Sequence, residues 1–250
     1  MFERMKVGRN MIKAIFFDLD GTLLPLKDSD FTSVYAKLLV TTLAKHGYEP
    51  NKLGSDVKQL MKLMYANDGS KTSEEVFFDL FTKEYGNKVH EDHDIYMSFY
   101  QNEFRGLKEV CGANDLAKDI VKYAREKAGL VVLATNSLLP YEAIKTRISF
   151  IDLTENNFDY ISKYETLHCT KPNPNFFKEI LNDMNLKANE VIMFGNNAIE
   201  DAICAMGAGI KTYLVDIGCL IYPETVKEKF EVISFNDIPK IIDKEIELNK

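Results

Sequence analysis

The sequence predicts an α/β protein with a Rossmann-like parallel-sheet core and an inserted α-helical bundle. Short apolar segments typical of buried strands alternate with helical patterns from residue 107 onward. A similar segment at 12–17 is separated from them by 29–106, where only helical patterns occur. We therefore predict a core domain of residues 1–28 and 107–250, and a helical domain of residues 29–106 inserted after the first strand.

The core is expected to contain six strands. Strands of a parallel sheet are buried on both faces and are therefore apolar throughout. The segments that fit are 12–17, 130–134, 158–162, 191–194, 211–215 and 231–234. Helical patterns lie between them, at 114–127, 140–150, from 173, at 198–206 and from about 237. This alternation implies a sheet covered by helices on both faces.

Four helices are predicted in the insertion. The first ends at Gly47, and the second has apolar residues at a period of 3.6. Thr72 and Glu75 have the spacing of a capping box, which places the start of the third. The fourth helix carries Ile95, Phe99 and Phe104. We interpret the aromatic stripes of these helices as bundle core rather than as ligand contacts.

Composition and charge argue against several classes of function. The net charge is −7 and no basic stripe is present, which is unfavourable for binding nucleic acid or anionic membranes. No apolar run approaches the roughly 20 residues of a membrane span. The N-terminus lacks the apolar stretch of a signal peptide, and residues 1–10 are expected to be a loose extension. The four cysteines are widely spaced, as is typical of reduced thiols, so we expect a cytoplasmic protein.

Two carboxylates mark the end of the first strand. Asp18 and Asp20 are separated by one residue, so in an extended backbone they point the same way. Two acids held together repel each other, and a divalent cation is the usual means of offsetting that repulsion. The segment therefore predicts a metal-assisted site.

Other polar residues follow the remaining strands. Thr135 and Asn136 come after 130–134, Asn196 comes after 191–194, and Lys171 lies just before a helix. Open α/β sheets bind ligands at the carboxyl ends of their strands. A nucleophilic acid, a hydroxyl group, a lysine and a polar loop together suit a phosphoryl group, whose transfer depends on positioning and charge neutralisation.

Four motifs, in order and spacing, resemble those of the haloacid dehalogenase-like superfamily of phosphatases. They are DLDGT (18–22), ATNS (134–137), KPNP (171–174) and GNNAIED (195–201). The helical insertion resembles the α-helical cap of that superfamily. The resemblance implies that Asp18 is the nucleophile that forms an aspartyl-phosphate, and that Asp20 protonates the leaving oxygen and then activates water. An aspartate at position 20 argues against the dehalogenase branch.

The resemblance also assigns the remaining residues. Thr135 would hydrogen-bond the phosphoryl oxygens with help from the Asn136 backbone, and Lys171 would neutralise charge on the nucleophile and the phosphoryl group. Mg²⁺ would be held by the Asp18 carboxylate, the Asp20 backbone carbonyl and the fourth motif, which contributes Asn196 and Asp201.

The fourth motif departs from the family pattern at one position. The residue after its glycine is usually an aspartate that binds Mg²⁺, and here it is Asn196. An amide oxygen can ligate a hard cation but brings no negative charge. Glu200 offers a partial replacement for that charge, although an acid that stabilises a helix N-terminus is the preferred interpretation of it. We expect weakened Mg²⁺ binding.

These residues predict a Mg²⁺-dependent phosphatase that acts on a small phosphorylated metabolite. Two alternatives remain open: a phosphomutase resembling β-phosphoglucomutase, and a catalytically weakened binding scaffold marked by Asn196. Nucleoside monophosphates, sugar phosphates and phosphoglycolate are all possible substrates at this point, because the fold does not determine the substrate.

Overall fold

A computed structural model describes residues 11–226 and 229–249, so the predicted extension at 1–10 lies outside the described residues. Its centre is a six-stranded, fully parallel sheet with the order β3-β2-β1-β4-β5-β6. The strands are β1 (Ala14–Phe17), β2 (Leu130–Leu133), β3 (Tyr160–Ile161), β4 (Val191–Gly195), β5 (Lys211–Asp216) and β6 (Val232–Ser234). The predicted α/β class and its six strands are confirmed.

Helices cover both faces of the sheet. Ile15 and Phe17 of β1 point into one apolar cluster, and the alternate residues Ala14 and Phe16 point into another. The first cluster is closed by α6 (Ala117–Ala128), α7 (Tyr141–Ile148) and α10 (Ile238–Leu248). The second is closed by α8 (Asn175–Asp183) and the short α9 (Cys204–Gly207). β1 is therefore buried on both sides, as its uninterrupted apolar sequence predicts.

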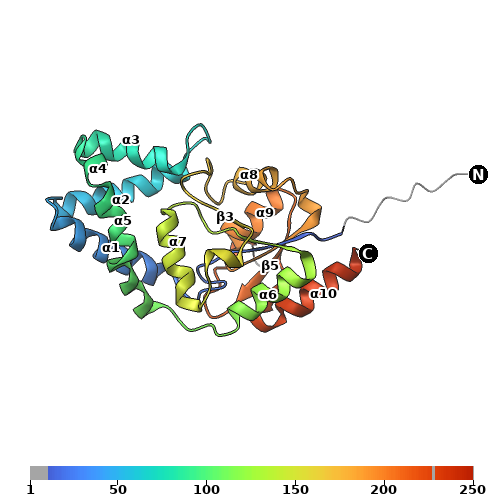
Figure 1. Ribbon diagram of the computed structural model, residues 1–250. Helices are drawn as coiled ribbons and strands as arrows, with labels where there is room; N and C mark the ends of the chain where they lie inside the picture. Colours follow the sequence, from blue (N-terminus) through green and yellow to red (C-terminus); the bar gives the residue numbers. More distant parts are fainter. Residues whose placement is uncertain (1–10, 227–228, 250) are drawn as a thin grey trace, which may run out of the picture.

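The insertion is a helical bundle without strands in its described residues, and it lies at the end of the molecule opposite the last helix, α10 (Figure 1). Its elements are α1 (Asp28–Ala44), α2 (Pro50–Tyr65), α3 (Ser73–Tyr85), α4 (Lys88–Glu91), α5 (His93–Gln101) and the 3₁₀ segment η1 (Glu103–Val110). The predicted capping box is present: Glu75 N–H donates to Thr72 Oγ1 (3.2 Å), and Thr72 N–H donates to Glu75 Oε2 (2.7 Å).

The predicted fourth helix is present in part. α5 carries Ile95 and Phe99, whereas Phe104 lies in η1, which is where the prediction is wrong. A separate short helix, α4, precedes α5 and was not predicted. The chain turns at Asp92 between α4 and α5, and the buried Asp92 carboxylate accepts a hydrogen bond from Lys88 Nζ (2.6 Å).

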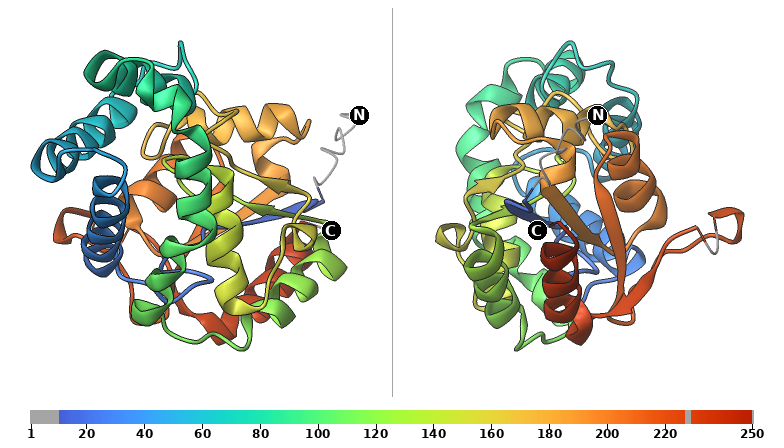
Figure 2. Two further views of the ribbon diagram at one scale, coloured as in Figure 1. Left: turned by 60° about the vertical axis from the view of Figure 1, so that its left-hand side comes forward. Right: turned by 90° about the vertical axis from the view of Figure 1, so that its right-hand side faces the viewer.

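Aromatic side chains fill the bundle, as expected. Tyr35 packs against the rings of Phe99 and Phe104, and the hydroxyl of Tyr96 donates to that of Tyr48 (2.6 Å). The same apolar cluster continues into the sheet core, and α7 lies between the two parts (Figures 1 and 2). The division of the chain into two domains at 28/29 and 106/107 stays a prediction.

The helix expected at 198–206 has a different form. Ala198–Ile203 makes π-helical turns (η5), and only the following residues form the α-helix α9. Ala202 N–H donates to Asn197 C=O (3.3 Å), five residues back, while the Asn197 side chain accepts from Ile199 N–H (3.0 Å). The widened turn places Asp201 next to Gly195 at the end of β4, where Asp201 forms part of the candidate active site.

Candidate active site

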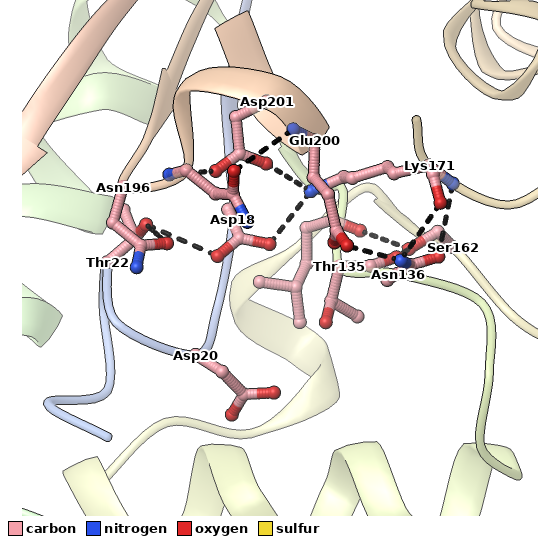
Figure 3. A network of polar contacts seen from close by, with 12 residues as sticks. Asp18, Asp20, Thr22, Thr135, Asn136, Ser162, Lys171, Asn196, Glu200 and Asp201 are labelled. Carbon is pink, nitrogen blue, oxygen red and sulfur yellow. Dashed lines mark hydrogen bonds and ion pairs between the residues drawn. The ribbon is translucent and has the colours of Figure 1, made fainter. Parts of the chain in front are cut away.

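The carboxyl ends of β1, β2 and β4 meet at one edge of the sheet. The register pairs Phe17 with Leu133 on one side and with Phe194 on the other. Asp18, Thr135 and Asn196 follow these strands directly or after one residue, so the structure brings all three together (Figure 3). They line a cavity of about 550 Å³ together with Asp20, Asn136 and Asp201. The sheet order changes direction at this point, which is where ligands bind in open α/β folds.

Asp18 is buried and held from both sides. Its Oδ1 accepts a hydrogen bond from Lys171 Nζ (2.8 Å), and its Oδ2 accepts one from Thr22 Oγ1 (3.2 Å). Gly21 adopts a φ of +85°, and a Cβ there would lie 2.1 Å from Asn196 Nδ2, so this turn requires glycine. The sequence motifs assign no role to Thr22, although its position four residues after Asp18 indicates that the two side chains are close.

Lys171 is almost fully buried between two carboxylates. Its Nζ donates to Asp18 Oδ1 and also to Asp201 Oδ1 (2.5 Å). Burial by itself would lower the pKa of Lys171, but the two carboxylates outweigh burial and raise the pKa well above its usual range. Lys171 is therefore a permanent positive charge directly behind Asp18 and Asp201, which line the cavity.

Asp201 completes this group. Its Oδ2 accepts from Asn197 N–H (2.9 Å), and a Cβ at Gly195 would lie 2.4 Å from Asp201 Oδ2. The glycine of the fourth motif thus makes room for this carboxylate. Burial, followed by the charge of Asp18, raises the pKa of Asp201 against the opposing effect of Lys171. Two carboxylates therefore share a single lysine, which leaves the group short of positive charge.

Thr135 and Asn136 form the opposite wall. Ser162 Oγ donates to Thr135 C=O (2.5 Å) and holds the loop after β2. Asn136 Oδ1 accepts from Lys171 N–H (3.1 Å), and its Nδ2 donates to Glu200 Oε2 (3.0 Å). Figure 3 shows Asn136 and Glu200 beside Lys171, in contact with the same network.

Glu200 links the core to the helical bundle. Besides Asn136, it accepts a hydrogen bond at Oε1 from the hydroxyl of Tyr65 on α2 (3.2 Å). Burial raises the pKa of Glu200, and Lys171 acts in the opposite direction. The structure therefore places this carboxylate on Asn136 and Tyr65, not at Asn196.

Asp20 lies apart from the network around Lys171 (Figure 3). Its carboxylate forms an ion pair with Arg147 of α7, whose side chain is 3% exposed and whose Nε also donates to Ala143 C=O (3.2 Å). Asp20 Oδ1 has no hydrogen-bond partner among the described residues. Burial raises the pKa of Asp20 to about 6, and Arg147 limits that rise. No sequence motif marks Arg147, which lies 127 residues from Asp20 on a helix face.

The oxygens near Asp18 suit a hard divalent cation. Asn196 Nδ2 donates to Cys219 C=O (2.8 Å), so its Oδ1 faces Thr22 and the Asp18 side of the cavity. The Asp18 carboxylate, the Asp20 backbone carbonyl and Asn196 Oδ1 are all oxygen donors of the kind that Mg²⁺ prefers. No cluster of three His, Cys, Asp or Glu residues suitable for a metal occurs within 11–226 and 229–249. The residues fit Mg²⁺, but with fewer charges than three carboxylates would provide.

A family model of the haloacid dehalogenase-like hydrolases matches residues 12–209. The chain belongs to this family. Its site and fold agree with that assignment: the matched segment contains every residue that the sequence motifs single out, including Asp18, Lys171 and Asp201. As a haloacid dehalogenase-like hydrolase it is an enzyme by family, and the predicted resemblance is confirmed.

Individual relatives within the haloacid dehalogenase-like hydrolases are distant. The chain is 24% identical to a glyceraldehyde 3-phosphate phosphatase of Pyrococcus furiosus, covering 93% of this chain and 92% of that one. It is 24% identical to the pyrophosphatase PpaX of Bacillus cereus, covering 92% and 96%. Among solved structures, a 2-haloacid dehalogenase of Pseudomonas syringae superimposes with a TM-score of 0.64 at 16% identity, covering 94% and 99%. The last similarity shows the fold alone.

No helix in the described part of this hydrolase combines the length and the apolar character needed to cross a bilayer.

Proposed function

We propose that the protein is a Mg²⁺-dependent phosphatase that hydrolyses a small phosphorylated metabolite through an aspartyl-phosphate on Asp18. The observation that carries this proposal is the position of Asp18 at the cavity floor, with one carboxylate oxygen on Lys171 and the other on Thr22. A buried carboxylate next to a permanent cation is suited to approach a phosphoryl group. The relatives that are named phosphatases support the same reaction class.

Hydrolysis would proceed in two displacements. In the first, an oxygen of Asp18 attacks phosphorus, the bond to the leaving oxygen breaks, and the protonated Asp20 carboxyl gives that oxygen its proton. In the second, the Asp20 carboxylate takes a proton from water, whose oxygen attacks phosphorus and releases Asp18 and inorganic phosphate. Lys171 and the Thr135 hydroxyl would stabilise the charge on the phosphoryl oxygens. A bound Mg²⁺ would supply the remaining charge neutralisation, held by Asp18, the Asp20 carbonyl, Asn196 and, through solvent, Asp201.

The test uses p-nitrophenyl phosphate with Mg²⁺ and the variant Asp18→Asn. Asn keeps the shape of the side chain and removes the nucleophile, so we expect turnover to fall by about 10³-fold or more. Asp119→Asn, which changes an exposed acid on α6, is the matched control and should retain the wild-type rate. Wild-type turnover by Asp18→Asn would refute the nucleophile assignment.

A weakened scaffold that binds a phosphate ligand is the second candidate, and Asn196 is the observation that favours it. It predicts no turnover by the wild type and no stabilisation by Mg²⁺, whereas a phosphatase shows both. Nothing among the described contacts of the helical bundle favours the phosphomutase alternative, which needs a second set of polar groups for a sugar.

We also infer that the protein acts in the cytoplasm on a small-molecule substrate, without a nucleic-acid or membrane partner. The four cysteines are all free, which supports a reducing compartment. The net charge of −7 supports the absence of polyanionic partners.

A further inference from the structure

The cavity above Asp18 changes in character with distance from the sheet. Its floor is polar and charged, as described above. Its walls come from α1 and α2 of the helical bundle and from the loop after β2, and most of the residues in them are apolar. The wall residues are Phe31, Tyr35, Ala36, Leu39, Val40, Val57, Met61 and Leu138.

Helix geometry explains why these residues form one surface. On α1, positions 31, 35 and 39 are each four apart, so their side chains lie along one face. On α2, Val57 and Met61 have the same spacing. Both faces turn toward the catalytic end of the sheet, and a water-sized hollow of about 30 Å³ continues between Leu39, Val57 and Met61 into the bundle.

The hydroxyl of Tyr35, among these wall residues, is already engaged. It lies 3.0 Å from the hydroxyl of Tyr100, inside the bundle and buried. The other polar side chains that α1 and α2 contribute to the cavity are exposed to solvent: Asp28, Thr32, Lys58, Lys62 and Tyr65. The hydroxyl of Tyr65 is bonded to Glu200. The middle of the cavity therefore offers little to a ligand that carries hydroxyl groups.

From this arrangement, and resting on the proposed phosphatase function, we propose that the substrate is a phosphomonoester whose leaving group is uncharged and mainly apolar: an alkyl or aryl alcohol rather than a sugar or polyol. The phosphoryl group would lie at Asp18 and Lys171, and the alcohol portion would lie between α1 and α2. A sugar placed there would lose hydrogen bonds to water without replacing them, whereas apolar carbon gains by leaving water. The volume of about 550 Å³ lies within the range of cavities that bind small organic ligands.

The first experiment compares kcat/KM for ethyl, butyl and hexyl phosphate with that for ribose 5-phosphate, using acetyl phosphate as a general phosphoryl donor. Each buried methylene should raise kcat/KM by about fourfold, until the wall is filled. If all four additional methylenes of hexyl phosphate are buried, its kcat/KM should exceed that of ethyl phosphate by about 250-fold, and ribose 5-phosphate should be the poorer substrate. Turnover of acetyl phosphate with a flat alkyl series, or a preference for ribose 5-phosphate, would overturn the apolar assignment and leave the phosphatase proposal intact.

A binding measurement separates this proposal from catalysis. Titration calorimetry with ethylphosphonate and hexylphosphonate, which cannot be hydrolysed at the carbon–phosphorus bond, should show tighter binding of the hexyl compound even if no phosphate ester is turned over. Tighter binding of the hexyl compound without turnover of any phosphate ester would refute the phosphatase proposal and still support an apolar binding wall. Equal affinities for the two phosphonates would overturn the wall assignment.

Substitution of a wall residue then tests where the alkyl group of the substrate binds. Met61→Gln keeps the length of the side chain and makes the wall polar, so the ratio of hexyl to ethyl kcat/KM should fall by about tenfold. Leu63→Gln is the matched control on the same helix: Leu63 is 42% exposed and does not line the cavity, so the ratio should not change. An unchanged ratio in folded Met61→Gln would place the alkyl chain elsewhere and overturn the proposal.

Discussion

The two sides of the Asp18 carboxylate differ in charge. On the lysine side, Oδ1 accepts from Lys171, which also pairs with Asp201. On the asparagine side, Oδ2 accepts from the neutral Thr22 hydroxyl, and the next group along is the neutral Asn196 amide. The chain completes the first side by itself, while the second side presents oxygens but no opposite charge. A cation that binds on the asparagine side is therefore attracted mainly by Asp18.

The largest expected effect comes from removing the cation of the lysine side. Lys171→Met leaves Asp18 and Asp201 buried next to each other without compensation, so one of them must take up a proton. We expect kcat/KM to fall by about 10³-fold or more, and the free energy of unfolding to fall by about 3–5 kcal/mol. Turnover and chemical denaturation measure the two effects.

Lys178→Met is the control for that variant, because Lys178 is an exposed lysine on the neighbouring helix α8. It should change neither quantity appreciably. If Lys171→Met retained more than a tenth of the activity, the lysine side would not be the source of charge neutralisation, and the comparison between the two sides would fail.

Restoring a charge on the asparagine side should have the next largest effect. Asn196→Asp adds a carboxylate near Asp18, and we expect the Mg²⁺ concentration for half-maximal rate to fall by about tenfold. Without Mg²⁺ the same variant should be less stable, because a carboxylate oxygen would face Cys219 C=O where the amide now donates. The rise in melting temperature on adding Mg²⁺ should therefore be larger than in the wild type.

Asn182→Asp, on the exposed surface of α8, controls for added charge alone and should leave the Mg²⁺ dependence unchanged. An unchanged or higher Mg²⁺ requirement in Asn196→Asp would show that Asn196 does not face the cation.

Asp20, which lies apart from both sides of Asp18 and pairs with Arg147, gives a pH-dependent test. Its pKa is raised to about 6, so the protonated form that can donate to a leaving oxygen is lost as pH rises through 6. For an alkyl phosphate, kcat/KM should then decrease by up to about tenfold per pH unit, and p-nitrophenyl phosphate, whose leaving group needs no proton, should show a much weaker decrease. The folded state should respond with the same sign: the contribution of Asp20 to the free energy of unfolding is complete below about pH 4 and is lost through pH 6.

Arg147 sharpens this test because it lowers the pKa of Asp20 against the effect of burial. Arg147→Met should move the descending part of the alkyl phosphate profile to higher pH, and Arg147→Lys should move it less. The lysine variant also retains a charge beside Asp20 if the methionine variant is poorly folded. Identical profiles in wild type and Arg147→Lys and Arg147→Met would show that the pair does not control Asp20.

The residues at the strand ends were far more accessible from the sequence than the contacts around them. Asp18, Thr135 and Asn196 follow apolar strand segments, and parallel strands bring their carboxyl ends to one edge regardless of the intervening chain. Their chemical roles stay predictions. Arg147 could not be found this way, because its contact with Asp20 joins a loop and a helix face that share no local pattern.

Local chemistry also explains which backbone features were missed. The π-helical turns at Ala198–Ile203 depend on Asn197, whose side chain and carbonyl both bond the turn, and apolar periodicity does not register such a widening. At Asp92, where α4 ends and α5 begins, the carboxylate bonds the Lys88 side chain, and apolar periodicity carries no information on such a polar contact.

The smallest expected effect concerns the bond between the bundle and the lysine side. Tyr65→Phe removes one hydrogen bond to Glu200, but Tyr65 is 43% exposed and Glu200 keeps its bond to Asn136. We expect kcat/KM to fall by about two- to fivefold, since a bond of this kind contributes about 0.5–1 kcal/mol. Tyr123→Phe removes a similar tyrosine–carboxylate bond, to Asp243 on the far helices, and should leave kcat/KM unchanged. An equal change in kcat/KM in both variants would mean that the Tyr65 bond contributes only to general stability. Glu200 would then not couple the helical bundle to the residues around Lys171.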